Sequence, residues 1–388
     1  MRIAVLSPTF LPAVGGAELV LYEIYRRLKR RHDVRMLTPL LAPDLLRDYA
    51  SDEYDVPFPV ERYADRRSFM KLRGHRWTAG AIPPFSLSAV AALRNLVRRF
   101  RPDVVNVHYV MPTGLAAVVA ERRLGVPTVV TVSGRDVPGP GVPRLWRRWQ
   151  RLVLRRVSDV SYVSAYCRDA LWARDAPGEV IYNGAEIPPP AGAPTAVRRD
   201  LEVDAAEPLI LALQRLAPEK RIDVVVRAVR ECRDRVGSGT LVIGGTGPED
   251  ARLRRLAGDL GVEKHVRFVG YVPRASLASY YAACDVFAFH STFETYGLVV
   301  AEAMSHGRAV VTVRNTALPE IVGDAGVLVE TGDWRAMGEA LARLVSDAPL
   351  RHRLAAAGRR RAADMFDWDR IAAKYEAILT RAAGRRRR

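Results

Sequence analysis

Short apolar segments alternate with amphipathic stretches along the first half of the chain. The apolar segments lie at residues 3–7, 34–38, 103–108, 127–132, 159–163 and 179–182, and helical spacing of apolar residues fills most of the intervals. Such short apolar runs are typical of strands covered on both faces, and a helix between two of them makes the strands parallel. The first half therefore predicts a doubly wound parallel sheet.

The same alternation restarts in the second half, after a stretch rich in Pro, Gly and Ala at residues 183–197. The second set of apolar segments lies at 208–213, 240–244, 266–270, 285–289, 309–313 and 326–329. We predict two α/β domains, an N-terminal one of residues 1–190 and a C-terminal one of residues 205–366, joined by a linker at 191–204. A last helix is expected at 367–382, before a basic tail at 383–388.

Polar residues and glycines follow the predicted strands in both halves. They are His108 and Tyr109, the run Ser133–Asp136, Asn183 and Gly184, Gln214 and Arg215, the run 244–247, and the run 291–297. Parallel sheets bind their ligands at the carboxyl ends of the strands. We therefore expect one site that faces both domains.

The charge of the chain narrows the choice of partner. Its 388 residues carry 60 Lys and Arg against 43 Asp and Glu, a net charge of +17, and nearly all of the cations are Arg. Such a surface attracts the phosphates of nucleic acid, anionic lipid or a nucleotide. The sequence has no zinc spacing, no aromatic RNA-binding signature and no helix-turn-helix pattern, so we expect no nucleic-acid partner.

The three cysteines are scattered, which predicts neither a disulfide framework nor a metal site and favours a reducing cytosol. No apolar run reaches membrane-spanning length, and prolines interrupt the apolar start of the chain, so a first strand is expected there rather than a signal peptide. We expect a cytoplasmic protein.

Two glutamates, Glu294 and Glu302, have seven residues between them, one of which is Gly297. A helix opening at Gly297 would offer unpaired amides to a phosphate, and glycine lets the backbone approach closely. Glu302, one turn inside that helix, could accept hydrogen bonds from ribose hydroxyls, with Glu294 nearer the phosphate. The alternative is a solvated Glu294 and a core Glu302 paired with Arg. The spacing favours a nucleotide diphosphate.

Two cations, Arg215 and Lys220, follow the first strand of the second half. Both can reach one anion held by that loop, and two cations would neutralise a diphosphate leaving group as charge builds on it. An ordinary basic surface explains them equally well when they are taken alone.

The second half resembles the retaining glycosyltransferases of family 4, which have the GT-B fold of two Rossmann-like doubly wound domains facing a central cleft. The resemblance rests on "RLAPEK" (215–220), "LVIGGTGPE" (241–249), "VRFVGYVP" (266–273), "STFETYGLVVAEAMSHGRAVV" (291–311) and "LPEIVGDAGVLVETGD" (318–333). The first half resembles the family more weakly, through "GGAE" (15–18), "VNVHY" (105–109), "TVSGRD" (131–136), "VSAY" (163–166) and "VIYNGAE" (180–186).

The resemblance implies a role for each motif residue. Arg215 and Lys220 would hold the donor diphosphate, Glu302 the ribose, and Glu294 the sugar or phosphate near the reacting carbon. His108 would face the sugar as a positioning group, and the last helix would cross back to the first domain. Further donor contacts are implied at Gly15, Gly16, Gly245, Gly247, Tyr296, Gly297 and Leu298, and acceptor-side positions at Glu18, Tyr109, Ser133, Arg135 and Asp136.

The chain departs from the family pattern at four places. Ser133 stands where His is frequent, Tyr296 where Phe is frequent, and Arg221 where Gly is frequent after Lys220. Thr316-Ala317 replaces a common glycine pair before "LPE", which leaves the choice of base and sugar open.

The implied reaction moves a hexose, with retention, from a UDP- or GDP-sugar to a hydroxyl of a glycan, glycolipid or lipid-linked acceptor, without a cofactor. We expect no obligatory metal, because the single Asp-x-Asp pair, Asp367 and Asp369, is better explained as the start of the last helix. A nucleotide-dependent oxidoreductase or epimerase is the alternative. Neither half carries G-x-G-x-x-G with an acid ending the second strand.

Two basic segments with aromatic residues, 65–77 and 142–159, bear on the acceptor. They could rest on anionic lipid headgroups, which would place the enzyme peripherally at the inner face of the cell membrane. They could equally be helices whose apolar face packs on the sheet and whose Arg face is in water. The sequence leaves both open.

Overall fold

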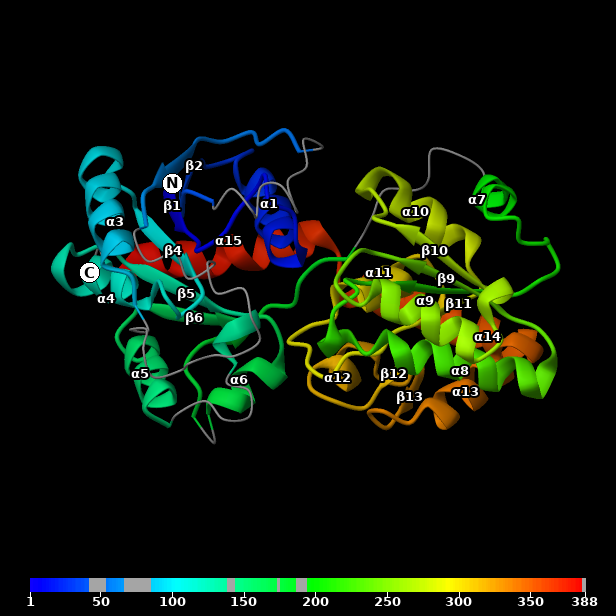
Figure 1. Cartoon of the computed structure of the whole chain (residues 1–388). Helices are drawn as coiled ribbons and strands as arrows, with labels where there is room; N and C mark the ends of the chain where they lie inside the picture. The colour runs from blue at the N-terminus through cyan, green and yellow to red at the C-terminus, as the bar shows by residue number, and fades with distance from the viewer. Residues whose placement is uncertain (42–53, 66–84, 138–143, 173–174, 186–193, 386–388) are drawn as a thin grey trace. The chain divides into compact units, whose positions relative to one another are not determined.

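The computed structural model describes residues 1–41, 54–65, 85–137, 144–172, 175–185 and 194–385. It divides into two compact units, which confirms the two parallel-sheet α/β domains expected from the sequence. The first unit comprises Met1–Asn183 with Trp368–Arg388, and the second comprises Gly184–Asp367 (Figure 1).

The first unit is built on a seven-stranded parallel sheet of order β3-β2-β1-β4-β5-β6-β7. Its strands are β1 (Arg2–Leu6), β2 (Asp33–Pro39), β3 (Val60–Tyr63), β4 (Val104–His108), β5 (Thr128–Val132), β6 (Asp159–Tyr162) and β7 (Glu179–Val180). Its helices are α1 (Gly16–Leu28), α3 (Leu87–Phe100), α4 (Gly114–Arg123), α5 (Arg144–Leu154), α6 (Ala165–Leu171) and α15 (Trp368–Gly384). The order reverses between β1 and β4, so the loops after these strands diverge there.

The second unit has a six-stranded parallel sheet of order β10-β9-β8-β11-β12-β13. Its strands are β8 (Leu209–Leu213), β9 (Thr240–Gly244), β10 (Val266–Gly270), β11 (Val286–Ala288), β12 (Ala309–Val313) and β13 (Val327–Val329). Its helices are α7 (Pro194–Asp200), α8 (Ile222–Val236), α9 (Asp250–Asp259), α10 (Arg274–Ala283), α11 (Leu298–Ser305), α12 (Leu318–Val322), α13 (Trp334–Ser346) and α14 (Ala348–Met365). Here the order reverses between β8 and β11, and β8 and β12 are buried along their whole length.

The chain enters the second unit earlier than the sequence predicted. The amide of Ala185 donates to the carbonyl of Phe366 at 2.9 Å, and the Ser305 hydroxyl donates to the Ala185 carbonyl at 3.1 Å. These bonds attach residue 185 to the second unit, so the predicted limit at residue 190 is too late.

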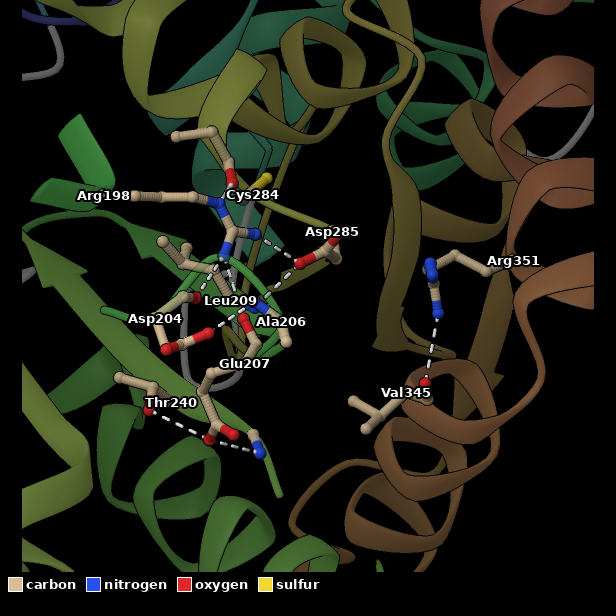
Figure 2. A network of polar contacts seen from close by, with 12 residues as sticks. Arg198, Asp204, Ala206, Glu207, Leu209, Thr240, Cys284, Asp285, Val345 and Arg351 are labelled. Atoms are coloured by element: carbon tan, nitrogen blue, oxygen red, sulfur yellow. Dashed lines mark hydrogen bonds and ion pairs between the residues drawn. The ribbon is translucent and has the colours of Figure 1, made fainter. Parts of the chain in front are cut away.

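Part of the predicted linker at 191–204 is the helix α7, and Arg198 holds it in the second unit. Figure 2 shows the Arg198 guanidinium among Asp204, Glu207 and Asp285. It pairs with Asp285 Oδ2 at 2.6 Å, and it donates to the Glu207 carbonyl at 2.9 Å and the Ala283 carbonyl at 3.0 Å. Pro, Gly and Ala content suggested a free connection, whereas one arginine with long-range partners fixes this segment.

The last helix, α15, belongs to the first unit, where Figure 1 shows it in red beside α1. Ile371, Tyr375 and Leu379 are buried along it. Asp369, from the single Asp-x-Asp pair, bonds to Arg27 of α1 at 2.7 Å, and this agrees with its reading as a helix start. Within the described ranges, no helix is both long and apolar enough to span a membrane.

Candidate active site

Lys220 and Glu294 meet at the carboxyl ends of the second sheet. Lys220 ends the short 3₁₀ helix Pro218–Lys220 after β8, and Glu294 lies in the loop after β11. The Lys220 ammonium donates to Glu294 Oε1, and the two side chains are 17% and 16% exposed. Strands β8 and β11 are neighbours at the reversal of strand order, which is why residues 74 apart in sequence touch.

The backbone around this pair is tied down on both sides. Thr292 donates through its amide and its hydroxyl to the Glu219 carbonyl, at 2.9 and 3.1 Å. The Glu294 amide donates to the Thr316 hydroxyl oxygen at 3.1 Å, and the Glu294 carbonyl accepts from the Ala317 amide at 3.2 Å. The loops after β8, β11 and β12 therefore form one hydrogen-bonded cluster.

Helix α11 starts three residues after Glu294, at Gly297 and Leu298. Gly297 has φ +93°, a backbone conformation that favours glycine, and a Cβ there would lie 2.7 Å from Leu318 Cδ2. The hydrogen bonds of the helix begin with Val300 and Ala301, which donate to the Gly297 carbonyl. The amides before them precede the helical ladder, as an anion site requires.

Arg215 lies on the same loop but has a different carboxylate as its partner. Its side chain is 58% exposed and pairs with Glu219 at 3.1 Å. Neighbouring Gln214 donates to the Lys220 carbonyl at 3.4 Å, which ties the two ends of this loop together. The structure thus places the two predicted cations on one short loop, each with its own carboxylate.

Glu302 lies in the core of the second unit, one turn inside α11. Its side chain is 4% exposed, accepts a hydrogen bond from the Tyr281 hydroxyl at 2.9 Å and lies 3.7 Å from Arg274. Burial raises the pKa of Glu302 to about 7, against the lowering effect of Arg274 and Tyr281. This is the core environment that the sequence left open as the alternative, and the ribose role remains a prediction.

Three other predicted donor residues have structural explanations. A Cβ at Gly245 would lie 1.9 Å from the Gln214 carbonyl oxygen, and one at Gly247 would lie 2.3 Å from that of Leu216. These glycines let the loops after β8 and β9 pack together. Tyr296 is 4% exposed, with its ring edge-on to Phe366 at a centroid distance of 6.0 Å.

In the first unit, the predicted acceptor-side residue Asp136 has its carboxylate bound by backbone amides. It is fully buried, and its carboxylate accepts from the amides of Val110 at 2.9 Å, Met111 at 3.1 Å and Ser133 at 3.3 Å. Burial raises its pKa to about 7, although the three amides lower it. A carboxylate enclosed in this way joins the loops after β4 and β5, and the acceptor-side role of Asp136 remains a prediction.

The end of β4 carries His108, which is 4% exposed and bonded through Nε2 to the Tyr25 hydroxyl at 2.7 Å. The same hydroxyl donates to Asn106 Oδ1 at 2.7 Å, and Asn106 Nδ2 donates to the Val129 carbonyl. Because the Tyr25 hydroxyl donates its single proton to Asn106, it can only accept from His108. The His108 ring therefore carries its proton on Nε2, and Nδ1 is left as an acceptor. Burial lowers its pKa to about 3, and the ring is neutral.

The loop after β1 leads into α1 through Gly15 and Gly16, and Glu18 lies in the first turn. Glu18 is 9% exposed and accepts a hydrogen bond from the Thr9 hydroxyl at 2.7 Å. A Cβ at Gly15 would lie 2.6 Å from Glu18 Oε2, so Glu18 turns back on its own loop.

Near Asp136, Tyr109 takes a left-handed conformation with φ +67°, and Ser133 caps the 3₁₀ helix Gly134–Asp136. The Arg135 side chain lies outside the described residues. Tyr109 thus follows β4, which ends at His108, and Ser133 follows the neighbouring strand β5, as the sequence predicted.

Four residues of these clusters were not singled out as site residues from the sequence: Tyr25, Arg274, Tyr281 and Thr316. Only Thr316 carried a signal, since it departs from the family pattern. The other three act through contacts between distant elements. Among the residues that the structure describes, no three His, Cys, Asp or Glu side chains gather as a metal site would require.

Comparisons with known proteins identify the family of the chain. The profile of the glycosyl transferases group 1 matches residues 195–361, and that of the glycosyl transferase 4-like domain matches residues 15–184. N-acetyl-alpha-D-glucosaminyl L-malate synthase of Bacillus anthracis is 24% identical over 95% of both chains. The GDP-mannose-dependent alpha-(1-6)-phosphatidylinositol monomannoside mannosyltransferase of Mycolicibacterium smegmatis is 28% identical over 96% of both chains.

Solved structures share the fold. Sucrose-phosphate synthase from Thermosynechococcus elongatus superposes with a TM-score of 0.80 at 21% identity, over 97% of this chain and 98% of that one. Anabaena HepE in complex with UDP-glucose superposes with a TM-score of 0.76 at 21% identity, over 98% of this chain and 99% of that one. With both halves matched by family profiles, the chain belongs to the group 1 glycosyl transferases of family 4 and has the GT-B fold.

Proposed function

We propose that this glycosyltransferase moves a hexose, with retention, from a UDP- or GDP-sugar to a hydroxyl of a glycan, glycolipid or lipid-linked acceptor. The observation that carries the proposal is the pair Lys220–Glu294, three residues before the start of α11. A cation, a carboxylate and free helix amides at one strand end suit a sugar linked to a diphosphate. The family profiles do not favour the oxidoreductase or epimerase alternative.

In this proposal the donor diphosphate replaces Glu294 as the partner of Lys220. Glu294 can then accept hydrogen bonds from sugar hydroxyls. The bond between the sugar C1 and the diphosphate oxygen breaks, the acceptor oxygen bonds to C1 on the same face, and the acceptor proton passes to the leaving diphosphate. Lys220, Arg215 and the α11 amides stabilise the charge that builds on that leaving group, so we propose that no metal is obligatory.

The donor classes follow from the chemistry of named relatives. One relative is GDP-mannose-dependent, and HepE has been solved with UDP-glucose. Both donors carry a diphosphate that Lys220 could bind, and we propose one of these two classes for this chain.

A lipid surface is the proposed location of the acceptor. Leu145 and Leu152 of α5 are 70% and 40% exposed, and the exposed Arg148 and Arg155 lie on the same helical face. Trp146 and Val153 are buried, so α5 packs on its unit and still presents an apolar and basic outer face. The segment 65–77 lies almost wholly outside the described residues.

Vesicle sedimentation tests that location. We expect the enzyme to sediment with vesicles that contain phosphatidylserine and to stay in solution with pure phosphatidylcholine. The double variant Leu145→Glu, Leu152→Glu should stay in solution with both. Equal sedimentation of wild type and variant would contradict the proposed surface.

A thermal-shift screen with UDP, GDP, ADP, UDP-glucose and GDP-mannose tests the donor site. Binding to the folded form raises Tm, so one uridine or guanosine series should stabilise the wild type. Lys220→Ala should abolish the rise and Arg215→Ala should reduce it. Arg230→Ala is the matched control, because Arg230 is also exposed and pairs with a carboxylate four residues on, Asp234, at 2.7 Å. No shift with any ligand would contradict the proposal.

A further inference from the structure

Thr316 is a β-branched residue in the left-handed region of the backbone, with φ +48°. Such residues avoid this region because Cβ crowds the backbone. It lies between β12 and α12. A conformation that glycine would adopt freely is thus imposed on threonine.

The hydroxyl of Thr316 has a complete and directional set of partners. It donates to Asn315 Oδ1 at 3.1 Å and accepts from the Glu294 amide at 3.1 Å. Asn315 is oriented by its Nδ2, which donates to the Ser291 carbonyl at 2.9 Å. These partners fix the direction of each hydrogen bond. Asn315 Oδ1 accepts the proton of the Thr316 hydroxyl, and the Thr316 oxygen accepts from the Glu294 amide.

The hydroxyl does not serve the helix that follows it. The first turn of α12 is closed by the Leu318 amide on the Asn315 carbonyl at 3.2 Å, and by the Ile321 amide on the Ala317 carbonyl at 3.1 Å. The other bonds of segment 315–317 go to Ser291, to Thr331 and to both backbone groups of Glu294. A helix cap does not explain Thr316.

We propose that Thr316 is a positioning residue, whose hydroxyl sets the backbone of Glu294 and so aims its carboxylate. This rests on the proposed function, in which Glu294 changes partner from Lys220 to the donor sugar. For that exchange the carboxylate must be able to rotate while its backbone stays fixed. Thr316 supplies the fixed end, and the backbone strain at φ +48° is kept because glycine offers no hydroxyl.

Three substitutions distinguish the effect of the Thr316 hydroxyl from the effect of the backbone strain. Thr316→Ser keeps the hydroxyl, Thr316→Ala removes it, and Thr316→Gly removes both the hydroxyl and the strain. We expect Thr316→Ser to keep kcat within about threefold, and the other two to lose about tenfold to a hundredfold, as misplaced catalytic groups do. Binding of UDP or GDP should change little, and Thr316→Gly should have a Tm equal to or above that of the wild type.

The measurement is hydrolytic release of UDP from UDP-glucose or of GDP from GDP-mannose, in which water takes the place of the acceptor, with hydrogen exchange at the Glu294 amide as a second readout. Exchange at that amide should be faster in Thr316→Ala and Thr316→Gly, and normal in Thr316→Ser. Wild-type kcat in both variants that lack the hydroxyl, or an unchanged exchange rate, would overturn the positioning role. A wild type that binds neither UDP nor GDP would instead overturn the proposed function, and the exchange rates would still decide whether Thr316 holds Glu294.

Discussion

Each unit places a carboxylate just beyond a strand of its sheet, and the two carboxylates are held in opposite ways. Asp136 of the first unit is fully buried, and backbone amides bind its carboxylate oxygens. Glu294 of the second unit has its backbone bound, while its carboxylate meets a lysine side chain. A carboxylate held by the backbone fastens loops together, whereas one paired with a side-chain cation can exchange that partner for a ligand.

The largest effect is expected for Glu294→Gln. Because the carboxylate is proposed to act on the sugar, kcat should fall by about 10²- to 10³-fold. Free UDP or GDP should bind as tightly as to the wild type or more tightly, since Lys220 no longer has a competing carboxylate. Calorimetry and nucleotide release measure both quantities. Glu231→Gln, which removes a carboxylate paired with Arg235, is the control. Weaker nucleotide binding in Glu294→Gln would contradict the exchange of partners.

Asp136→Asn should lower stability and largely keep activity, the reverse of what is expected for Glu294→Gln. The amide cannot accept all three backbone bonds, so the free energy of unfolding should fall by roughly 2–3 kcal/mol. The protein that remains folded should keep kcat within about fivefold. Urea unfolding gives the first value, and nucleotide release per folded molecule gives the second. A stable but inactive variant would indicate that Asp136 acts on the acceptor, as the family resemblance implies.

Glu302 gives a pH-dependent test in the second unit. Its pKa of about 7 in the folded protein lies above the ordinary 4.5, so its contribution to stability is full below pH 4.5 and is lost as the pH rises through 7. The difference corresponds to at most about 3 kcal/mol. Urea unfolding at pH 5 and pH 8 should show a smaller loss of stability in Glu302→Gln than in the wild type. An identical loss would mean that Glu302 is ionised throughout this range.

The smallest effect is expected for Tyr25→Phe. The loss of the hydroxyl leaves Asn106 Oδ1 and His108 Nε2 without the partner that they share, at a cost of about 1–2 kcal/mol. The proton of His108 is then no longer fixed on Nε2, and ¹⁵N spectra of the ring should show a mixture of tautomers. Tyr22→Phe is the control on the same helix, since the Tyr22 hydroxyl donates at the surface to the Asp55 carbonyl. A spectrum unchanged in Tyr25→Phe would mean that another group sets the tautomer.

The sequence was sufficient for the order of most strands and helices, because buried parallel strands form apolar runs that few other structures produce. It missed β3, whose segment Val-Glu-Arg-Tyr is half polar at the edge of the sheet. It took α7 for part of a linker, because the bonds of Arg198 to residues up to 87 positions away leave no local pattern.

The site was predictable to the extent that its residues follow strands. Lys220, Glu294 and Gly297 come together for that reason alone. The environments of Asp136 and Gly245 were not predictable, and that of Glu302 was predicted only as one of two alternatives. Each is decided by a neighbour on another element: the amide of Val110, the carbonyl of Gln214 and the ring hydroxyl of Tyr281.

Helix α15 makes the first unit discontinuous in sequence, and this bears on how the chain is synthesised. Its residues Tyr375, Ile378 and Leu379 are buried in the unit that begins at Met1, and the Tyr375 ring stacks on His108 at a centroid distance of 6.4 Å. A ribosome therefore completes the whole second unit before it supplies the helix that closes the first. The residues made earliest keep an open hydrophobic surface until α15 has been made, and a chain that stops at residue 367 leaves that surface exposed.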